Sequence, residues 1–216
     1  MKPLVVVYTA IFGNYDTLRQ QPNNPRAIYR CYGDHPQPSK QWKFISRERK
    51  QASIQLDARY HKIMCHYMDD CDCSIWIDAN NRLWDDPVSI CKKWLADADI
   101  AVFRHPYRDC IYVEEQACEH FKKDDPQIMR QHVARYRAEG YPAHNGLAST
   151  GFIARRHTPQ VKKFNEFWWN EVLSGSYRDQ LSFPYVAWKT GMKIQWVLGH
   201  AEIMADVKRP HKPYKG

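Results

Sequence analysis

Short apolar runs that favour β-strands alternate with longer segments of helical periodicity along the whole chain. The predicted strands are rich in β-branched or aromatic side chains and lie at residues 4–8, 28–32, 42–46, 74–78, 100–103, 149–154 and 193–198. The predicted helices lie at residues 53–68, 87–96, 110–121, 125–138, 159–173 and 180–189. Strands that alternate with helices predict an α/β fold, in which helices cover both faces of a mostly parallel central sheet. We therefore expect a three-layer α/β/α sandwich.

The composition is that of a globular chain able to bury a core. Of its 216 residues, 44% are hydrophobic and 26% are charged. No repeat, low-complexity tract or long linker divides the chain, so we expect residues 1–216 to form a single domain. The thirteen tyrosines and eight tryptophans fit either a cleft for a flat or sugar-like ligand or a well-packed core.

The formal net charge of +8 favours an anionic partner, such as nucleic acid, an acidic membrane surface or phosphate groups. The densest basic clusters, at residues 47–50, 155–157 and 208–212, are short and far apart in the sequence. A nucleic-acid-binding protein remains an alternative on charge alone, and its binding would depend steeply on salt. The scattered charges predict no contiguous basic face, so we expect no nucleic-acid partner.

The seven cysteines are an odd number without a C-x-x-C pair, and Cys71 and Cys73 are too close for a zinc knuckle. We therefore expect free, partly buried thiols in a reducing compartment. The apolar run at residues 4–8 is too short for a signal peptide or a membrane span, and no other segment is long enough. The sequence thus predicts a soluble cytoplasmic protein without a transmembrane segment, unless it is a piece of a longer polypeptide.

The predicted strand at residues 74–78 runs directly into the triplet Asp78-Ala79-Asn80. A buried strand that stops at an acidic group presents that group at the edge of the sheet, where open α/β sheets bind ligands. A divalent cation on a diphosphate takes oxygen ligands from carboxylates and amides. The triplet therefore indicates a cation–diphosphate site, with an ordinary polar turn as the alternative. The loop at residues 9–16 follows the first strand and is expected at the same edge.

Seven segments, in order along the chain, carry a resemblance to a known family. They are residues 7–16 (VYTAIFGNYD), 59–66 (RYHKIMCH), 74–80 (SIWIDAN), 105–109 (HPYRD) with Glu114 and Glu115, 150–157 (TGFIARRH), 177–183 (YRDQLSF) and 209–213 (RPHKP). The ordered set is similar to the glycosyltransferase-like domains of bacteria, plants and viruses that were long described only as a domain of unknown function. The resemblance covers nearly the whole chain.

The resemblance implies a fold of the glycosyltransferase A (GT-A) type. A nucleotide-binding half would occupy about residues 1–100, and an acceptor-binding half with a basic tail about residues 101–216. The family's donor is a nucleoside-diphosphate sugar, most often UDP-linked, and a hexosyl or deoxyhexosyl group would pass to a hydroxyl of a glycan acceptor with a Mn²⁺ or Mg²⁺ ion. The alternative within the family is a relative that binds a sugar nucleotide without transferring the sugar.

The resemblance also assigns roles to single residues. The nucleoside pocket would be lined by Thr9, Ala10, Phe12 and Tyr15, and the nucleotide would be contacted by Arg59, Lys62, Asp78 and Lys212. The metal would be held by Asp78, Asn80 and His211. Many relatives carry a second aspartate where this chain has Asn80, and an uncharged amide predicts a weaker grip on the metal. Arg209 and Lys212 could share the neutralisation of the departing diphosphate.

Asp179 is the predicted catalytic residue, because an inverting transferase needs a general base near the acceptor hydroxyl. An N-cap of the helix that follows is an equally supported interpretation of this residue. Glu114 and Glu115 are alternative bases, although a solvated helix face is the better explanation for at least one of them.

Overall fold

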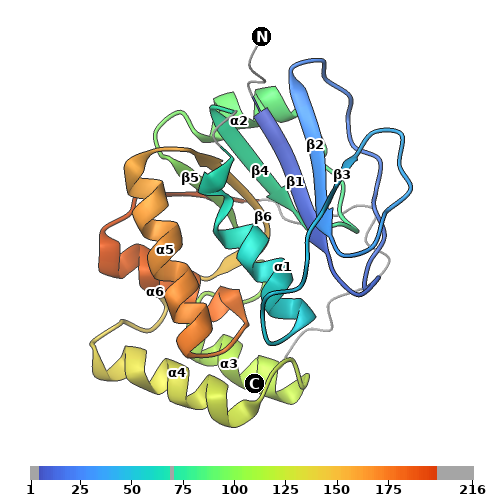
Figure 1. Cartoon of the computed structure of the whole chain (residues 1–216). Coiled ribbons are helices and arrows are strands. Elements are labelled where there is room, and N and C mark those ends of the chain that lie inside the picture. The colour runs from blue at the N-terminus through green and yellow to red at the C-terminus, as the bar shows by residue number, and fades with distance from the viewer. Residues whose placement is uncertain (1–4, 69–70, 199–216) are drawn as a thin grey trace.

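The computed structural model describes residues 5–68 and 71–198 of the chain. Its seven described strands form one sheet in the order β3-β2-β1-β4-β6-β5-β7 (Figure 1). The strands are β1 (Val5–Ile11), β2 (Ala27–Gly33), β3 (Lys43–Ser46), β4 (Cys73–Ile77), β5 (Ile100–Arg104), β6 (Ala148–Arg156) and β7 (Ile194–Val197). Neighbouring strands are parallel except that β6 runs antiparallel to both β4 and β5. The predicted α/β class with a mostly parallel sheet is therefore confirmed.

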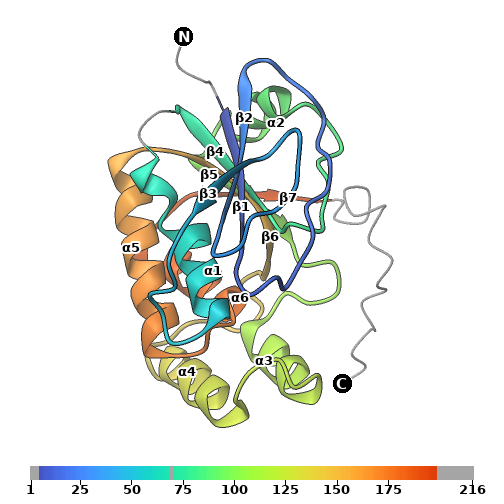
Figure 2. The same ribbon diagram turned by 45° about the vertical axis from the view of Figure 1, so that its right-hand side comes forward.

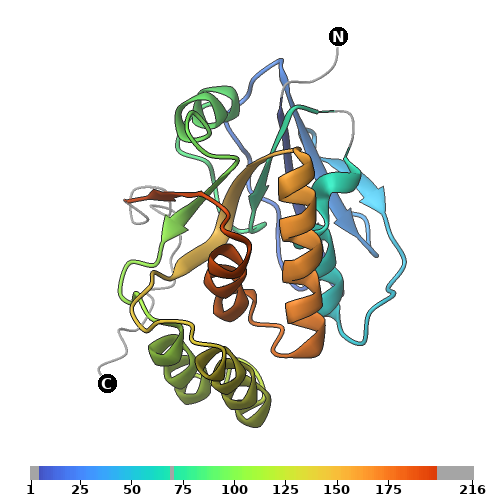
Figure 3. The ribbon, with the colours of Figure 1, turned by 90° about the vertical axis from the view of Figure 1, so that its left-hand side faces the viewer.

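Helices cover both faces of this sheet. The helices are α1 (Ile54–Ile63), α2 (Pro87–Trp94), α3 (Ile111–His120), α4 (Pro126–Ala138), α5 (Pro159–Ser174) and α6 (Asp179–Thr190). Figure 2 shows α1, α5 and α6 on one face and α2 on the other. Figure 3 shows α3 and α4 packed together below the sheet.

The alternating side chains of β1 build two separate cores, one on each face. Val6 and Tyr8 pack in the larger core beneath α1, α5 and α6. Val5 and Val7 pack in the smaller core beneath α2. All four side chains are fully buried. Because side chains alternate between the faces of a strand, a continuous apolar run is the pattern of a strand covered on both sides. The three-layer sandwich follows from this arrangement.

The helix expected at residues 53–68 is shorter than predicted. The structure ends α1 at Ile63 and continues with a 3₁₀ turn at Cys65–Tyr67. The last carbonyls of α1 are bound from distant elements: Tyr8 Oη donates to the carbonyl of Lys62 at 3.0 Å, and Arg155 Nη1 donates to that of Ile63 at 3.2 Å. A helix of this length needs no further turn when its terminal carbonyls are already satisfied. The prediction failed because Arg155 comes from β6, far along the chain.

Smaller features of the structure concern a helix cap, the thiols and the lengths of the helices. Asp125 caps α4, since its carboxylate accepts hydrogen bonds from the backbone of Gln127 and Ile128. All seven cysteines are free thiols, and six of them are buried, as expected. Within the described residues, no helix is both long enough and apolar enough to cross a bilayer.

Candidate functional site

A small pocket of about 130 Å³ lies at the carboxyl ends of β1 and β4. Three segments line it: the end of β1 with the loop that follows, one face of α1, and the end of β4. The lining residues are Thr9, Ala10, Phe12, Tyr15, Asp16, Ile54, Gln55, Ala58, Arg59, Trp76, Asp78, Ala79 and Asn80. The pocket thus brings together seven predicted site residues from three separate segments: Thr9, Ala10, Phe12, Tyr15, Arg59, Asp78 and Asn80.

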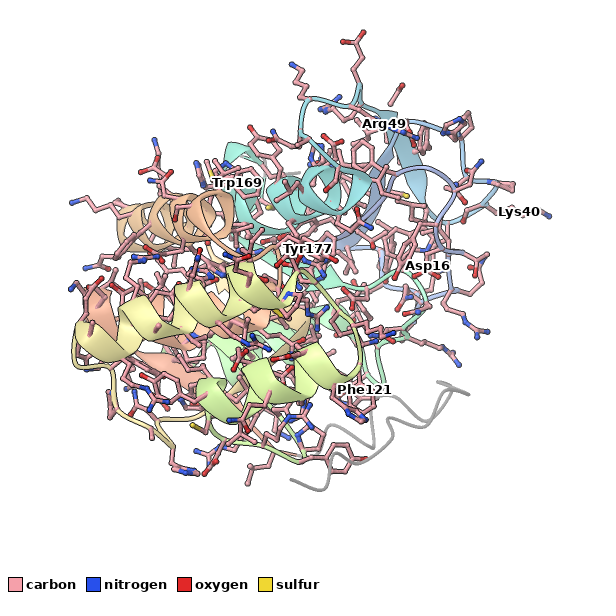
Figure 4. The ribbon with its side chains drawn as sticks, turned by 90° about the horizontal axis from the view of Figure 1, so that it is seen from below. Asp16, Lys40, Arg49, Phe121, Trp169 and Tyr177 are labelled. Carbon is pink, nitrogen blue, oxygen red and sulfur yellow. The ribbon has the colours of Figure 1, made fainter. Side chains whose placement is uncertain are left out.

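The other predicted site residues lie elsewhere. Lys62 and Asp179 are buried and do not line the pocket. His211 and Lys212 fall outside the described residues, so the predictions for them stay predictions. Figure 4 views the molecule from below, with Asp16 on the loop after β1 and Tyr177 near α1, two residues before Asp179.

One wall of the pocket is aromatic and firmly held. The imidazole of His61 stacks between Phe12 and Tyr32, with ring centroids 5.6 Å and 4.9 Å away and nearly parallel planes. Burial, and secondarily the charge of Arg47, lowers the pKa of His61 to about 4, so this ring is neutral at physiological pH. Phe12 is itself 2% exposed, whereas Tyr15 is 78% exposed. The arrangement offers a fixed apolar wall and an open aromatic ring, which suit a flat ligand.

The loop after β1 is fixed by a carboxylate. Gly13 and Asn14 both adopt positive φ angles, 66° and 53°, so the chain turns tightly here. Asp34 Oδ1 accepts a hydrogen bond from the Gly13 backbone N–H at 2.8 Å. Asp34 Oδ2 forms an ion pair with Arg49 Nε at 2.5 Å. Burial raises the pKa of Asp34, but hydrogen bonds from His35, Gly13 and Arg49 outweigh it and hold the pKa well below its usual range. The pocket therefore has a preorganised rim.

Asp78 is oriented by two contacts made before any ligand arrives. Trp76 Nε1 donates to Asp78 Oδ1 at 2.9 Å, and the Asp78 backbone donates to the carbonyl of Gly151 at 2.9 Å. Gly151 also leaves room for the carboxylate, since a β-carbon there would lie 3.1 Å from Asp78 Oδ2. Asp78 is half-buried, and Asn80 is exposed.

These residues fit a hard divalent cation in part. A carboxylate oxygen and an amide oxygen are ligands of the type that Mg²⁺ and Mn²⁺ take, and a diphosphate would supply further oxygens. No cluster of three or more His, Cys, Asp or Glu side chains suited to a metal occurs in the described part of the chain. Of the three predicted metal ligands, Asp78 and Asn80 line the pocket, and His211 lies outside the described residues.

One buried hydroxyl near the pocket lacks a hydrogen-bond partner in the described part of the chain. Thr9 is fully buried and lines the pocket, and its Oγ1 has no hydrogen-bond partner among the described residues. A buried hydroxyl without a partner is costly. The Thr9 side chain shares the strand face of Val7 and Ile11, so it lies on the side of the sheet away from Trp76.

Behind the pocket, a buried carboxylate holds two cations. Asp179 is 1% exposed; its Oδ1 lies 3.1 Å from Arg59 Nε and its Oδ2 lies 2.5 Å from Lys62 Nζ. Burial raises the pKa of Asp179, but the charges of Arg59 and Lys62 outweigh it and hold the pKa well below its usual range. Burial lowers the pKa of Lys62 to about 8, and the Asp179 carboxylate opposes that shift. Both members of the pair are charged at neutral pH.

Two interpretations of these acidic residues are corrected by the structure. Asp179 is not an N-cap: Arg178 occupies that position, and Asp179 is the first residue of α6. Glu114 and Glu115 do not form a solvated face, since they are 3% and 7% exposed. Arg108 reaches Glu114 from the loop after β5, with Nε 2.6 Å from Oε2. Burial raises the pKa of Glu115. Packing of α3 against neighbouring elements, which periodicity does not reveal, decides their burial.

Sequence reasoning missed Trp76 and Gly151, which position Asp78. Trp76 had a usable signal, because residues two apart on a strand share a face. Gly151 had none, because it comes from β6 and only the tertiary fold brings it to Asp78.

A larger hollow, of about 750 Å³, lies at the opposite end of the sheet. It is lined by Asp97, Asp99, Arg156, Lys163, Lys193 and their neighbours, at the amino ends of β5 and β7. We place the candidate site in the smaller pocket, because open α/β sheets bind ligands beyond the carboxyl ends of their strands. The smaller pocket also contains the preorganised carboxylate.

Gly151→Ala is expected to impair the site with little loss of stability. The added methyl group would crowd Asp78 Oδ2 at 3.1 Å and Asn81 Nδ2 at 3.4 Å. We expect ligand affinity to fall roughly tenfold, because the carboxylate must move, and the free energy of unfolding to fall by about 1 kcal/mol. Titration calorimetry and urea unfolding measure the two effects. Gly191→Ala is the control: with φ +64° it is strained but remote. Equal affinity losses in both variants would contradict the prediction.

Residues 41–209 match the sequence model of a family described as TOD1/MUCI70, glycosyltransferase-like domain. The match covers well over half of the chain, and the chain therefore belongs to this family. The resemblance inferred from the sequence is confirmed. The mostly parallel seven-stranded sheet confirms the expected α/β architecture, and the GT-A type of fold stays a prediction.

Two curated relatives come from Arabidopsis thaliana. The chain is 30% identical over 148 residues to the probable hexosyltransferase MUCI70. The matched region covers 63% of this chain and 26% of that protein. The chain is 28% identical over 145 residues to the alkaline ceramidase TOD1. That matched region covers 62% of this chain and 31% of that protein. The matched region thus spans between a quarter and a third of these relatives.

Among solved structures, the crystal structure of mouse xyloside xylosyltransferase 1 in its apo form is similar to this chain. The TM-score is 0.49 at 9% sequence identity, with 90% of this chain and 84% of that chain covered.

Proposed function

We propose that this domain transfers a hexosyl or deoxyhexosyl group from a nucleoside-diphosphate sugar, UDP-linked, to a hydroxyl of a glycan acceptor. The observation that carries the proposal is the composition of one pocket. An aromatic wall, an arginine and an oriented carboxylate meet there at the carboxyl edge of the sheet. A nucleoside diphosphate presents a flat base, a diphosphate and a bound cation, and each has a counterpart among these groups. The family and the relative named a hexosyltransferase support the same reaction class.

In the proposed complex the base lies against Phe12 and Tyr15. The diphosphate lies between Arg59 and Asp78, where the guanidinium donates to phosphate oxygens. A Mn²⁺ or Mg²⁺ ion on Asp78 and Asn80 would supply positive charge to the diphosphate.

During transfer, the bond between the anomeric carbon and the β-phosphate oxygen breaks, and a bond forms between that carbon and the acceptor oxygen. The acceptor hydroxyl gives up its proton to a base, and the nucleoside diphosphate departs with the bonding electron pair. Charge therefore grows on the β-phosphate, and Arg59 stabilises it there. The pocket accelerates departure because its donors are fixed before the reaction begins.

A thermal-shift panel tests the donor class. UDP-glucose, UDP-galactose and GDP-mannose are added with Mn²⁺ or with a chelator, because a ligand that binds only the folded state stabilises it by about 2.7 kcal/mol at a concentration 100 times its Kd. We expect a UDP-sugar to raise the melting temperature, more so with Mn²⁺. A short DNA oligonucleotide is the comparison ligand. Stabilisation by the oligonucleotide and by none of the sugar nucleotides would overturn the proposal in favour of nucleic-acid binding.

Turnover is then measured as release of UDP in the presence of glycan acceptors. Ceramide hydrolysis is assayed in parallel, because one relative is named an alkaline ceramidase. We expect UDP release that depends on acceptor. Binding of a UDP-sugar without any release would leave a non-catalytic sugar-nucleotide-binding relative as the function.

A further inference from the structure

Both oxygens of the Asp179 carboxylate lie beside cations, although Arg59 Nε makes an ion-pair contact and no hydrogen bond with it. Oδ1 lies 3.1 Å from Arg59 Nε, and Oδ2 lies 2.5 Å from Lys62 Nζ and accepts a hydrogen bond from Thr150 Oγ1 at 3.1 Å. Thr150 Oγ1 in turn accepts one from Lys62 Nζ at 3.0 Å. The four side chains come from α1, β6 and α6, so the cluster ties three elements together behind the pocket.

Burial within the cluster is graded towards the pocket. The side chains of Asp179 and Lys62 are 1% and 2% exposed, whereas that of Arg59 is 20% exposed. Arg59 lines the pocket, and the other two do not. The carboxylate therefore lies behind the guanidinium, and it meets the Nε side.

The charges around the cluster include the carboxylate of the pocket. Arg59 and Lys62 carry two positive charges and Asp179 one negative charge, and the Asp78 carboxylate also acts on Lys62. Arg59 alone of the two cations lines the pocket, so it is the one placed to meet the diphosphate of the proposed donor.

We propose that Asp179 is a positioning residue: it fixes the Arg59 guanidinium at the wall of the pocket and thereby sets the affinity for the donor diphosphate. This inference rests on the proposed function and assigns Asp179 a different role from the general base predicted from the sequence. A base must reach the acceptor proton, whereas this carboxylate is held behind Arg59 on two cations. The tether removes the conformational freedom that a long arginine side chain otherwise loses when it binds a ligand.

The change in UDP affinity on Asp179→Asn distinguishes three possible roles of this carboxylate: positioning, general base and purely electrostatic. Positioning predicts weaker UDP binding, because Arg59 loses its tether. A base role predicts unchanged UDP affinity with slower transfer. A purely electrostatic role predicts tighter UDP binding, because removing a negative charge near the pocket favours an anion. Only the first outcome supports the inference, and either of the others overturns it.

Titration calorimetry with UDP and Mg²⁺ is carried out on the unaltered chain, on Asp179→Asn, on Arg59→Gln and on the double variant. We expect Asp179→Asn to weaken UDP binding on the order of tenfold, as supporting partners of ligand-binding groups typically do. In the Arg59→Gln background the same change should alter affinity by less than about twofold, because coupled residues are not additive. Additive effects of the two changes would overturn the inference.

Glu171→Gln is the matched control for stability. Glu171 of α5 is also a buried carboxylate paired with an arginine, and its Oε2 lies 2.5 Å from Nη2 of Arg135 on α4. Glu171→Gln should lower the free energy of unfolding without changing UDP affinity. A loss of UDP affinity equal to that of Asp179→Asn would overturn the inference. If Asp179→Asn does not fold, Thr150→Val decides the question by removing one hydrogen bond to Asp179. A few-fold loss of affinity supports the inference, and unchanged affinity overturns it.

The two proposals fail in different ways. If the unaltered chain binds no nucleoside diphosphate, the proposed function is overturned, and this inference falls with it. If the unaltered chain binds UDP and Asp179→Asn binds it equally well, only the inference is overturned.

Discussion

Replacing Asp78 with alanine is expected to abolish UDP release from a UDP-sugar while leaving the fold intact. Asp78 is half-buried at the end of β4, and the variant loses the carboxylate that Trp76 Nε1 orients at 2.9 Å. A carboxylate cannot itself stabilise the negative charge that grows on the diphosphate, so Asp78 would act through the cation that it helps to hold. Loss of that cation's stabilisation is expected to cost roughly 10²–10³ in rate. UDP release is measured at saturating donor with Mn²⁺.

The matched control for Asp78→Ala is Asp97→Ala. Asp97 is also a carboxylate beside a hollow, but it lies at the opposite end of the sheet. We expect this variant to turn over the donor at the unaltered rate. Normal UDP release by Asp78→Ala, or equal losses in the two variants, would contradict the assignment of the site.

Asp179→Asn is expected to lower the free energy of unfolding by about 3–5 kcal/mol at pH 7, because it leaves buried Lys62 and Arg59 without their counter-ion. The residue is 1% exposed, and its ion pair with Lys62 spans 2.5 Å. Natural domains are stable by about 5–15 kcal/mol, so the variant should remain folded but melt early. Urea unfolding measures the difference.

The loss of unfolding free energy caused by Asp179→Asn should become smaller as the pH falls. The folded chain holds the pKa of Asp179 well below its usual range, so the unfolded chain binds this proton more readily. The stabilisation is complete above the unfolded value of about 3.9 and is lost as the pH falls towards the folded value. The unaltered chain and Asp179→Asn should therefore differ most at neutral pH and converge below about pH 4. A difference under about 1 kcal/mol at pH 7, below even the smallest cost expected for a broken buried pair, would contradict the account.

The sheet could be predicted from the sequence because each strand carries its own local signal. The apolar run at Val5–Ile11 has the composition of a strand covered on both faces, and the structure covers it with α1 and α2. The candidate pocket followed from the same logic. Parallel strands end at a common edge, so the loop after β1 and the triplet Asp78-Ala79-Asn80 had to lie near each other.

The buried ion cluster could not be predicted, because it depends on contacts between distant segments. Lys62 follows Arg59 by three residues on α1, so a shared face was foreseeable. Its burial was not, because Thr150 and Asp179, from β6 and α6, hold it inside. The end of α1 could not be predicted for the same reason, because Arg155 of β6 binds the carbonyl of Ile63 there. Local patterns predict elements and edges, whereas partners of buried charges emerge only from packing.

A crystal structure of this chain with UDP and Mn²⁺ tests the central claim most directly, with the anomalous signal of manganese marking the cation. The account predicts manganese beside Asp78, the diphosphate between Asp78 and Arg59, and the base against Phe12. UDP in the hollow beside Asp97 and Lys193, or manganese remote from Asp78, would contradict it.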